Sequence, residues 1–414
     1  MVAATLTAPR ARGAPSPADP ALPALAVLLS AEEMAPFLHR SLAADAAAVD
    51  VRVHHVRYQP GKKAVVRYDV ELEGRRYDAI AMIAARPYLA RRAVKPESLA
   101  LVRLVDGRSP AREPLRYEPE LDALVQWYPL DLALPALAEP PARLLDELAP
   151  AEAELGATEP ATLAYRPRRR AVLRVGEHVL KLYAKREDFE VAAGGLRAAG
   201  SLRGVRTPAF EGWLPKRLAT MQSLLPGTSP SQARAVAAEA GELLRNLQSA
   251  SPSNIAASPP FHQLATAGAS AAFLVALVPA LERRLQELLR RLEASVPTVG
   301  RLVLSHGDFS ARQLLVTPGG VSVVDLDALR FAPAALDAAT YAAHLVFGGL
   351  NDLGEATVVL EELLAGYGER PLGLDWYLAT SILRHARSPF RYLDEHWPER
   401  IDEMVAAAEG ALAP

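Results

Sequence analysis

Alternation of apolar and polar residues marks two β-rich segments in the first half of the chain, and the two segments resemble each other. Residues 58–67 read Tyr-Gln-Pro-Gly-Lys-Lys-Ala-Val-Val-Arg, and residues 165–174 read Tyr-Arg-Pro-Arg-Arg-Arg-Ala-Val-Leu-Arg. A further strand pattern follows each segment, and the Val-Gln-Trp of 125–127 recurs loosely as Met-Gln-Ser at 221–223. Two landmarks that recur in the same order indicate an internal duplication. We therefore predict two tandem α+β units.

The two copies differ at one informative position. Lys181 lies at the centre of the apolar strand His178–Tyr183, and aligning the strands places it opposite Ala81 of the first copy. A lysine in such a strand either extends along the sheet edge or points at an anion. Any function that needs this lysine is therefore expected in the second copy alone.

After residue 227 the spacing of apolar residues changes from two to three or four. Leucines at 281, 285, 288, 289 and 292 follow the pattern of an amphipathic helix. Further helices are predicted over 334–346, 355–365, 375–387 and 399–412. One short β island interrupts them, with strand patterns at 302–304, 313–316 and 321–325. We predict a flexible tail over 1–20, a cap domain over 21–140, a small lobe over 141–226 and a mostly helical lobe over 227–414.

The β island carries the candidate chemistry. A hairpin around the Thr-Pro-Gly-Gly turn of 317–320 predicts that Gln313 faces Asp325 across the strand pair. Asp308 lies five residues before Gln313. Carboxylate and amide oxygens gathered in this way suit a hard cation such as Mg²⁺.

Charge and composition narrow the class of protein. The 414 residues contain 46 Lys and Arg against 48 Asp and Glu, so the net charge of −2 gives no argument for a nucleic-acid or membrane partner. The chain has no cysteine, which excludes disulfides, thiol catalysis and cysteine metal sites. No apolar run is long enough for a membrane span, and no signal peptide is recognisable. We expect a cytoplasmic protein, and its oligomeric state stays open.

The segment from His306 to Gln313 resembles the catalytic loop His-Gly-Asp-x4-Asn of the aminoglycoside phosphotransferase and choline kinase superfamily. Val-Asp-Leu-Asp at 324–327 is similar to the metal-binding motif of that superfamily. The resemblance implies an α+β, protein-kinase-like fold with a small β-rich N-lobe and a helical C-lobe, here preceded by the cap. It also implies ATP and Mg²⁺ as cofactors, with Asp308 accepting the proton of the substrate hydroxyl.

Roles for the remaining residues follow from the same resemblance. Gln313 and Asp325 would bind Mg²⁺, and Asp327 would be either a further ligand or a surface acid. Lys181 would pair with the ATP phosphates, held by a helix glutamate for which Glu190 is the first choice and Glu187 the second. The remaining assignments are Gln222 and Leu224 in the adenine-binding hinge, Arg170 either at the phosphates or in a solvated turn, Asp337 as a brace of the catalytic loop, and Arg384 with His385 either in the acceptor pocket or on a helix face.

Gln313 departs from most of the superfamily, which has Asn at this position. Bacterial maltokinase-like sugar kinases share this Gln and an N-terminal cap, so a sugar or sugar-like hydroxyl is the expected acceptor. Two alternatives remain open. One is an aminoglycoside phosphotransferase, for which acidic residues of the last helices would form the acceptor pocket. The other is a nucleotide-binding pseudokinase that acts as an interaction protein.

Overall fold

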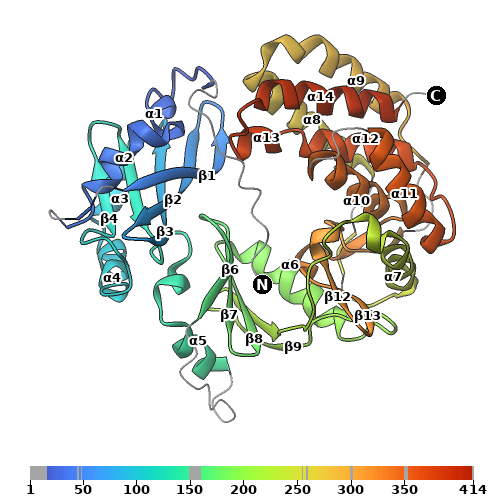
Figure 1. The fold of residues 1–414 in the computed structure, drawn as a ribbon, viewed down its shortest axis with the longest axis horizontal. Helices are drawn as coiled ribbons and strands as arrows, with labels where there is room; N and C mark the ends of the chain where they lie inside the picture. Colours follow the sequence, from blue (N-terminus) through green and yellow to red (C-terminus); the bar gives the residue numbers. More distant parts are fainter. Residues whose placement is uncertain are drawn as a thin grey trace.

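The computed structural model describes residues 16–43, 46–47, 49–148, 160–253, 255–257, 260–298, 302–348 and 353–412. Three parts lie around the centre of the molecule (Figure 1). The cap, in blue, and the green N-lobe each contain an antiparallel sheet, whereas the yellow-to-red C-lobe is mostly helical. None of the helices in the described ranges combines the length and the apolarity that a membrane span requires.

The cap is one antiparallel sheet with short helices. Its elements are α1 (Leu25–Leu29), α2 (Ala31–His39), β1 (Asp50–Gln59), β2 (Lys63–Leu72), β3 (Arg75–Ala84), α3 (Leu89–Ala93), α4 (Pro96–Leu104), β4 (Leu115–Glu118) and β5 (Ala123–Trp127). The strand order is β1-β2-β3-β5-β4. Ser30 starts α2 by accepting a hydrogen bond from the Glu33 N–H at 3.2 Å, as an N-cap serine does.

The N-lobe repeats this topology. After η1 (Pro135–Ala138) come α5 (Pro141–Leu148), β6 (Ala161–Arg166), β7 (Arg170–Val175), β8 (His178–Tyr183), α6 (Arg186–Ala199), β9 (Phe210–Leu214) and β10 (Ala219–Ser223). The strand order β6-β7-β8-β10-β9 is that of the cap, strand for strand. The recurring sequence segments therefore fold into sheets of the same topology.

Strand register corrects the predicted equivalence of Lys181 and Ala81. Lys181 pairs with Val172, whose counterpart in the repeat is Val65, and Val65 pairs with Met82. Met82 is therefore the counterpart of Lys181. The prediction was wrong by one residue because the hairpin is shorter in the second copy, and one residue in a strand exchanges the two faces of the sheet.

The two sheets stack and share a core. Val65, Ile80 and Met82 of the cap sheet are buried in one apolar cluster with Leu180 and Leu182 of the N-lobe sheet. Side chains alternate along a strand, so Lys181 points to the opposite face of the N-lobe sheet, toward the C-lobe. The stack thereby directs the lysine face of the N-lobe at the functional loops.

The C-lobe is built from helices around two small β pairs. Its elements are η2 (Arg234–Val236), α7 (Ala237–Ser249), α8 (Pro260–Leu277), η3 (Pro279–Leu281), α9 (Glu282–Ala294), β11 (Leu302–Ser305), η4 (Ala311–Gln313), β12 (Leu314–Thr317), β13 (Gly320–Val323), η5 (Leu326–Ala328), β14 (Arg330–Pro333), α10 (Ala335–Gly348), α11 (Leu353–Tyr367), α12 (Leu374–His385), α13 (Ser388–Arg391) and α14 (Trp397–Ala411). The predicted α+β, kinase-like fold with a preceding cap is confirmed, whereas the exact domain boundaries stay predictions.

Aromatic contacts join the cap to the C-lobe. The ring of Tyr58 on β1 lies 5.8 Å from that of Phe390 in α13, and the His55 ring lies 5.5 Å from that of Tyr392. On the other side of the cap, Arg67 donates a hydrogen bond to the Tyr165 carbonyl of the N-lobe at 2.7 Å. The cap therefore bridges the two lobes.

Candidate active site

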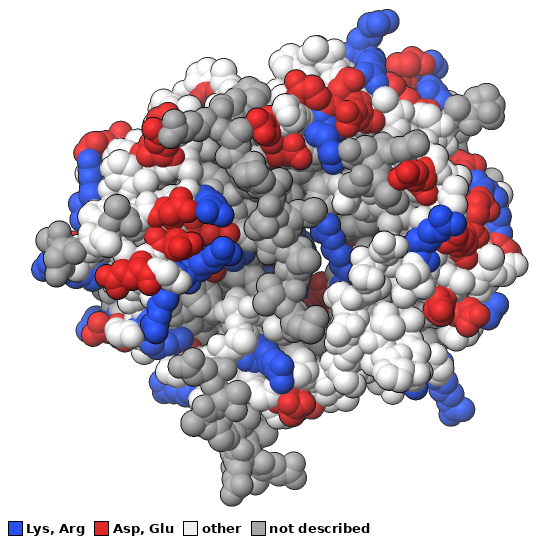
Figure 2. Space-filling model, in the orientation of Figure 1, with Lys and Arg blue, Asp and Glu red and all other residues white. Residues whose placement is uncertain are grey.

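A central cleft is lined by residues from all three parts of the molecule. The cap contributes Arg57, the N-lobe contributes Arg170, and the C-lobe contributes Asp308, Gln313 and Asp325. On the face of the molecule shown in Figure 2, basic and acidic side chains are interspersed.

The loop after β11 holds Asp308 at the cleft. Gly307 has a φ of +79°, and a Cβ there would lie 2.6 Å from the Ala328 carbonyl oxygen, so only glycine fits. The buried Asp337 carboxylate accepts hydrogen bonds from the N–H groups of His306 at 2.7 Å and Gly307 at 2.9 Å. The His306 ring donates to the Val324 carbonyl at 2.9 Å. The predicted bracing role of Asp337 is confirmed, and His306 has a structural role in the same loop.

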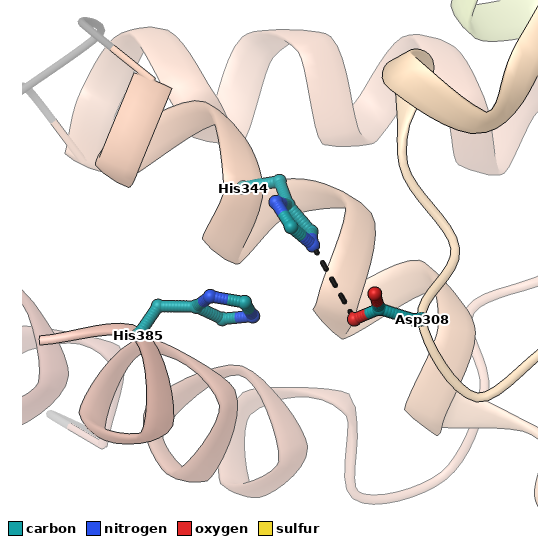
Figure 3. Close-up of side chains that lie close together, drawn as sticks. All are labelled: Asp308, His344 and His385. Carbon is teal, nitrogen blue, oxygen red and sulfur yellow. Dashed lines mark ion pairs between the residues drawn. The ribbon is translucent and has the colours of Figure 1, made fainter. Parts of the chain in front are cut away.

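Two helices surround the Asp308 carboxylate with nitrogen donors (Figure 3). His344 of α10 lies 3.6 Å and Arg384 of α12 lies 3.3 Å from one Asp308 oxygen, and the His385 ring lies beside that of His344. Burial by itself would raise the pKa of Asp308, but the His344 contact and the Arg384 charge outweigh it and hold the pKa well below its usual range. Asp308 is therefore a carboxylate at neutral pH.

Asp308, His344 and His385 also lie close enough together to suggest a metal site, since a ligand atom from each falls within 4.8 Å of the others. Arg384 argues against a cation there, because its Nη2 lies 3.3 Å from Asp308 and 3.2 Å from His385 Nε2. Burial and the neighbouring His344 and Arg384 hold the pKa of His385 well below its usual value, so its ring is neutral. The group suits the binding of a hydroxyl better than that of a metal.

The second acidic group follows β13. Asp325 has a φ of +64°, a left-handed conformation that aspartate tolerates better than most residues. Arg170 holds both Asp325 oxygens, at 2.7 and 2.9 Å, and also donates to Asp327. Lys181 Nζ lies 3.0 Å from Asp325 and 2.6 Å from Asp327, and the Tyr183 hydroxyl donates to Asp327 at 3.1 Å. Two carboxylates and two cations thus meet where the lobes face each other.

Electrostatics keep Asp325 and Lys181 charged. Burial opposes the charge of Asp325, but Lys181 and Arg170 hold its pKa well below the usual range. Burial likewise opposes the charge of Lys181, and the two aspartates nevertheless raise its pKa. Asp327 is thus brought to Lys181 and is no isolated surface acid, although phosphate binding by Lys181 and metal binding by Asp325 and Asp327 stay predictions.

The predicted pairing of Gln313 with Asp325 is wrong by one residue. The turn is tighter than expected, with Thr317 paired to Gly320, so Gln313 lies opposite Val324 and its carbonyl accepts the Val324 N–H at 2.9 Å. Asp325 comes after the paired strand. Both side chains still line the cleft, and the Gln313 side chain makes no hydrogen bond with the described residues. Gln313 as a metal ligand stays a prediction.

The structure does not bring Glu190 to Lys181. Glu190 lies on the solvent side of α6, 3.8 Å from Arg186, whereas Phe189, Ala192 and Ala193 face the core. Glu187 is exposed as well. The helix register explains the correction, because the apolar face of α6 is buried and both glutamates point away from it. Asp325 and Asp327 take the place of the predicted glutamate.

The hinge prediction is corrected in one respect. The Leu224 N–H donates to the Glu177 carbonyl at 2.8 Å and is not free for adenine. Gln222 is buried within β10, opposite Val179. Beyond it, Thr228 pairs with Val316, so the connection between the lobes is attached to the β12–β13 hairpin. Adenine binding by this segment stays a prediction.

His344 and Tyr183 were missed by reasoning from the sequence. His344 follows Asp337 by seven residues in the same helix, which places both on one helix face. That spacing could have identified it. Tyr183 follows Lys181 by two residues in β8, on the same face of the sheet.

Comparison with known proteins identifies the family. Solved structures with related folds include a choline/ethanolamine kinase family protein of Mesorhizobium loti, at 16% identity over 66% of this chain and 95% of that chain, with a TM-score of 0.46. An aminoglycoside phosphotransferase of Streptomyces rimosus matches at 19% identity over 59% of this chain and 98% of that chain, with a TM-score of 0.45. No curated protein sequence matches, so the resemblance to maltokinase-like enzymes stays a prediction. The model of the phosphotransferase enzyme family matches residues 166–377, half of the chain, and the protein therefore belongs to that family.

Proposed function

We propose that the protein transfers the γ-phosphoryl group of ATP to a hydroxyl group of a small molecule, most simply a sugar or sugar-like metabolite, in the cytoplasm. One observation carries the proposal: a braced, ionised Asp308 and a cation-paired Asp325–Asp327 group line the same cleft. A base at one side and phosphate- and metal-binding groups at the other are the parts that phosphoryl transfer requires.

The donor set fits Mg²⁺. Asp325 and Asp327 offer carboxylate oxygens within reach of the same two cations, and Gln313 offers an amide oxygen in the same cleft. Such hard oxygen ligands are those of Mg²⁺ sites, which take further ligands from phosphates and water. When bound, the ion would neutralise charge on the β- and γ-phosphates. Lys181 and Arg170 would then exchange carboxylates for phosphate oxygens.

The reaction follows from the groups present. Asp308 orients the acceptor hydroxyl and accepts its proton. A bond forms between the acceptor oxygen and the γ-phosphorus, while the bond from that phosphorus to the β–γ bridging oxygen breaks and ADP leaves with the electron pair. His344 and Arg384 hold the carboxylate in position and favour its charged form.

Replacement of the base tests the proposal. We expect Asp308→Asn to lower kcat by about 10²- to 10⁴-fold, since general-base catalysis contributes about that much. The KM for ATP should stay within a few-fold of the wild-type value. The measurement is ADP formation with Mg²⁺ on a panel of neutral sugars, sugar phosphates, sugar acids and aminoglycosides, and Asp106→Asn on the exposed surface is the control.

Two outcomes contradict the proposal. Full activity of Asp308→Asn would remove Asp308 from its role. Binding of ATP by the wild type without transfer to any member of the panel, with either Mg²⁺ or Mn²⁺, would favour the pseudokinase alternative.

A further inference from the structure

An arginine cluster lies in the cleft beyond Asp308. It consists of Arg57 on β1, Arg166 and Arg169 around the β6–β7 turn, and Arg387 and Arg391 around α13, and all five line the cleft. The cap, the N-lobe and the C-lobe each contribute at least one member. Residues so far apart in the sequence meet only in the folded molecule, which argues for a binding surface rather than a solvated basic run.

No carboxylate of the described residues forms an ion pair with this arginine cluster, although the Asp188 carboxylate lies close enough to act on the charges of Arg57 and Arg169. Arginines elsewhere do find partners, as Arg67 does with Asp78 at 2.6 Å and Arg284 with Glu409 at 2.7 Å. In the cluster no member makes an ion pair or a side-chain hydrogen bond with a described residue, and Arg387 Nε is buried without any acceptor. Arg57, Arg387 and Arg391 are half-buried, whereas Arg166 and Arg169 are exposed. A buried charged donor left unpaired, as Arg387 Nε is, is costly and indicates a missing anionic partner.

The electrostatics of the arginine cluster support the same conclusion. Burial lowers the pKa of Arg391 to about 9, and the charges of Arg387, Arg169 and Arg166 contribute to the shift. Burial and the charges of Arg384 and Arg169 also lower the pKa of Arg387. These like charges therefore repel one another at close range, and a bound anion would relieve the repulsion.

The position of the arginine cluster separates it from the predicted phosphate site of ATP. Lys181 and Arg170 already provide cations there, paired with Asp325 and Asp327. Arg57 and Arg391 instead belong to the junction of the cap and the C-lobe, where Tyr58 packs against Phe390. Arg57, Arg387 and Arg391 thus lie on the acceptor side of the cleft, and Arg166 and Arg169 approach Arg391 from the turn before Arg170.

Spacing along the C-lobe sets the size of the ligand. Arg384 contacts Asp308, and Arg387 lies three residues later, in the turn between α12 and α13. A molecule about as long as one sugar ring could therefore place a hydroxyl at Asp308 and an anionic group at Arg387.

We propose that the phosphoryl acceptor is an anionic hydroxyl compound whose phosphate ester or carboxylate group binds to the arginine cluster. The proposal rests on the proposed function and specifies its substrate class. Guanidinium groups bind phosphate and carboxylate through paired, charge-assisted hydrogen bonds. The same unneutralised positive charge repels a polycationic aminoglycoside, so the antibiotic alternative is disfavoured.

Matched acceptors of different charge test this proposal. We expect glucose 6-phosphate or glucuronate to be phosphorylated with a kcat/KM at least about 10-fold above that of glucose and of glucosamine, because a charge-assisted hydrogen bond contributes a factor of about 10 or more. Sugar phosphate and sugar acid together distinguish a phosphate-binding from a carboxylate-binding cluster. A preference for glucose or glucosamine would overturn the inference and leave the proposed function intact.

Substitutions in the arginine cluster test whether it binds the anionic acceptor. Arg387→Gln and Arg391→Gln should each raise the KM for the anionic acceptor by about 10-fold or more, with kcat and the KM for ATP within a few-fold of wild type. Arg391→Lys should retain part of the affinity, which separates lost charge from misfolding. Arg283→Gln on the exposed face of α9 is the matched control and should change nothing. An unchanged KM in both Gln variants would overturn the inference.

A binding measurement tests the role of the arginine cluster even if no acceptor is turned over. In that case the proposed function fails separately. Calorimetry with glucose 6-phosphate, in the presence of a non-hydrolysable ATP analogue, should then show binding that both Gln variants weaken. Binding that is absent from the wild type, or that is independent of the two arginines, would overturn the inference.

Discussion

Asp308 carries its charge in surroundings that would otherwise favour the neutral acid. The nearest groups that reverse this preference are His344 and Arg384, on separate helices. In the proposed role of general base, Asp308 would be ionised before the substrate arrives, which spares the enzyme the cost of deprotonating it. Its basicity is correspondingly low, so proton transfer must occur late, when the acceptor hydroxyl has become acidic by bonding to phosphorus.

This arrangement predicts a pH profile. A carboxyl whose folded-state pKa is depressed contributes stability above its unfolded-state pKa of about 4 and loses it only as the pH falls through the lower folded value. Between about pH 5 and 8, kcat/KM should therefore show no acid limb from Asp308. Arg384→Gln removes a stabilising charge and should move the acid limb to higher pH, as measured by initial rates across buffers of constant ionic strength.

One result would contradict the predicted pH profile. An acid limb that lies in the neutral range for the wild type, and does not move in Arg384→Gln, would show that another group limits the reaction. Exposed Arg370, which precedes α12 and pairs with Asp375 of its first turn at 2.7 Å, provides the control substitution Arg370→Gln.

At the scale of elements, α6 packs unusually closely against the turn η5. A Cβ on Gly195 would lie 2.5 Å from the Leu326 carbonyl oxygen and 3.2 Å from Leu329 Cβ, so glycine lets the helix reach the backbone between Asp325 and Asp327. The neighbouring Gly194 has open space around it. The two adjacent glycines of one helix therefore have different roles.

Alanine at these two positions should have opposite effects. Gly194→Ala should stabilise the protein by about 0.5–1 kcal/mol, because alanine favours helix. Gly195→Ala should destabilise it by about 1–3 kcal/mol through overpacking, and lower the kcat/KM for ATP by displacing the aspartates. Urea unfolding and steady-state kinetics measure both. Equal changes in stability for the two variants would contradict the close packing.

The helices and strands also show how much of the fold can be predicted from the sequence. Periodicity predicts both sheets, the helical lobe and the hairpin, because each is a local pattern. Strand register was wrong by one residue at Lys181 and at Gln313, since register depends on turn length rather than on periodicity. The Glu190 prediction failed because pairing with Lys181 depends on how α6 packs. The Asp337 brace was predicted from its motif, whereas the arginine cluster assembles from three parts of the fold and leaves no local pattern.

At the scale of the whole molecule, the cap and the N-lobe form one stack. Met82, the counterpart of Lys181, is fully buried in the core between their sheets. The cap face that corresponds to the nucleotide face of the N-lobe is thus filled by protein. The cap therefore has no room for a nucleotide on that face. Its contribution is its position, where it bridges the two lobes.

Placing a lysine at Met82 of the cap tests whether the core between the two sheets is shared and closed to water. Met82→Lys should destabilise the protein by about 3 kcal/mol or more, because it buries an unpaired charge, whereas Met82→Leu should cost less than about 1.5 kcal/mol. Denaturant unfolding followed by fluorescence measures both changes. Tolerance of the lysine without loss of stability would contradict a shared, dry core.

The two sheets have the same topology and stack as the units of a repeat protein do. In such an array each unit covers its neighbour, and the last unit needs a different kind of partner to close its free face. Here the free face carries Lys181, and the loop of Asp325 and Asp327 closes it. The candidate active site therefore lies at the end of the array, where a third unit would otherwise stack. A further duplication between the N-lobe and the helical lobe would extend the array and separate the lysine from its aspartates.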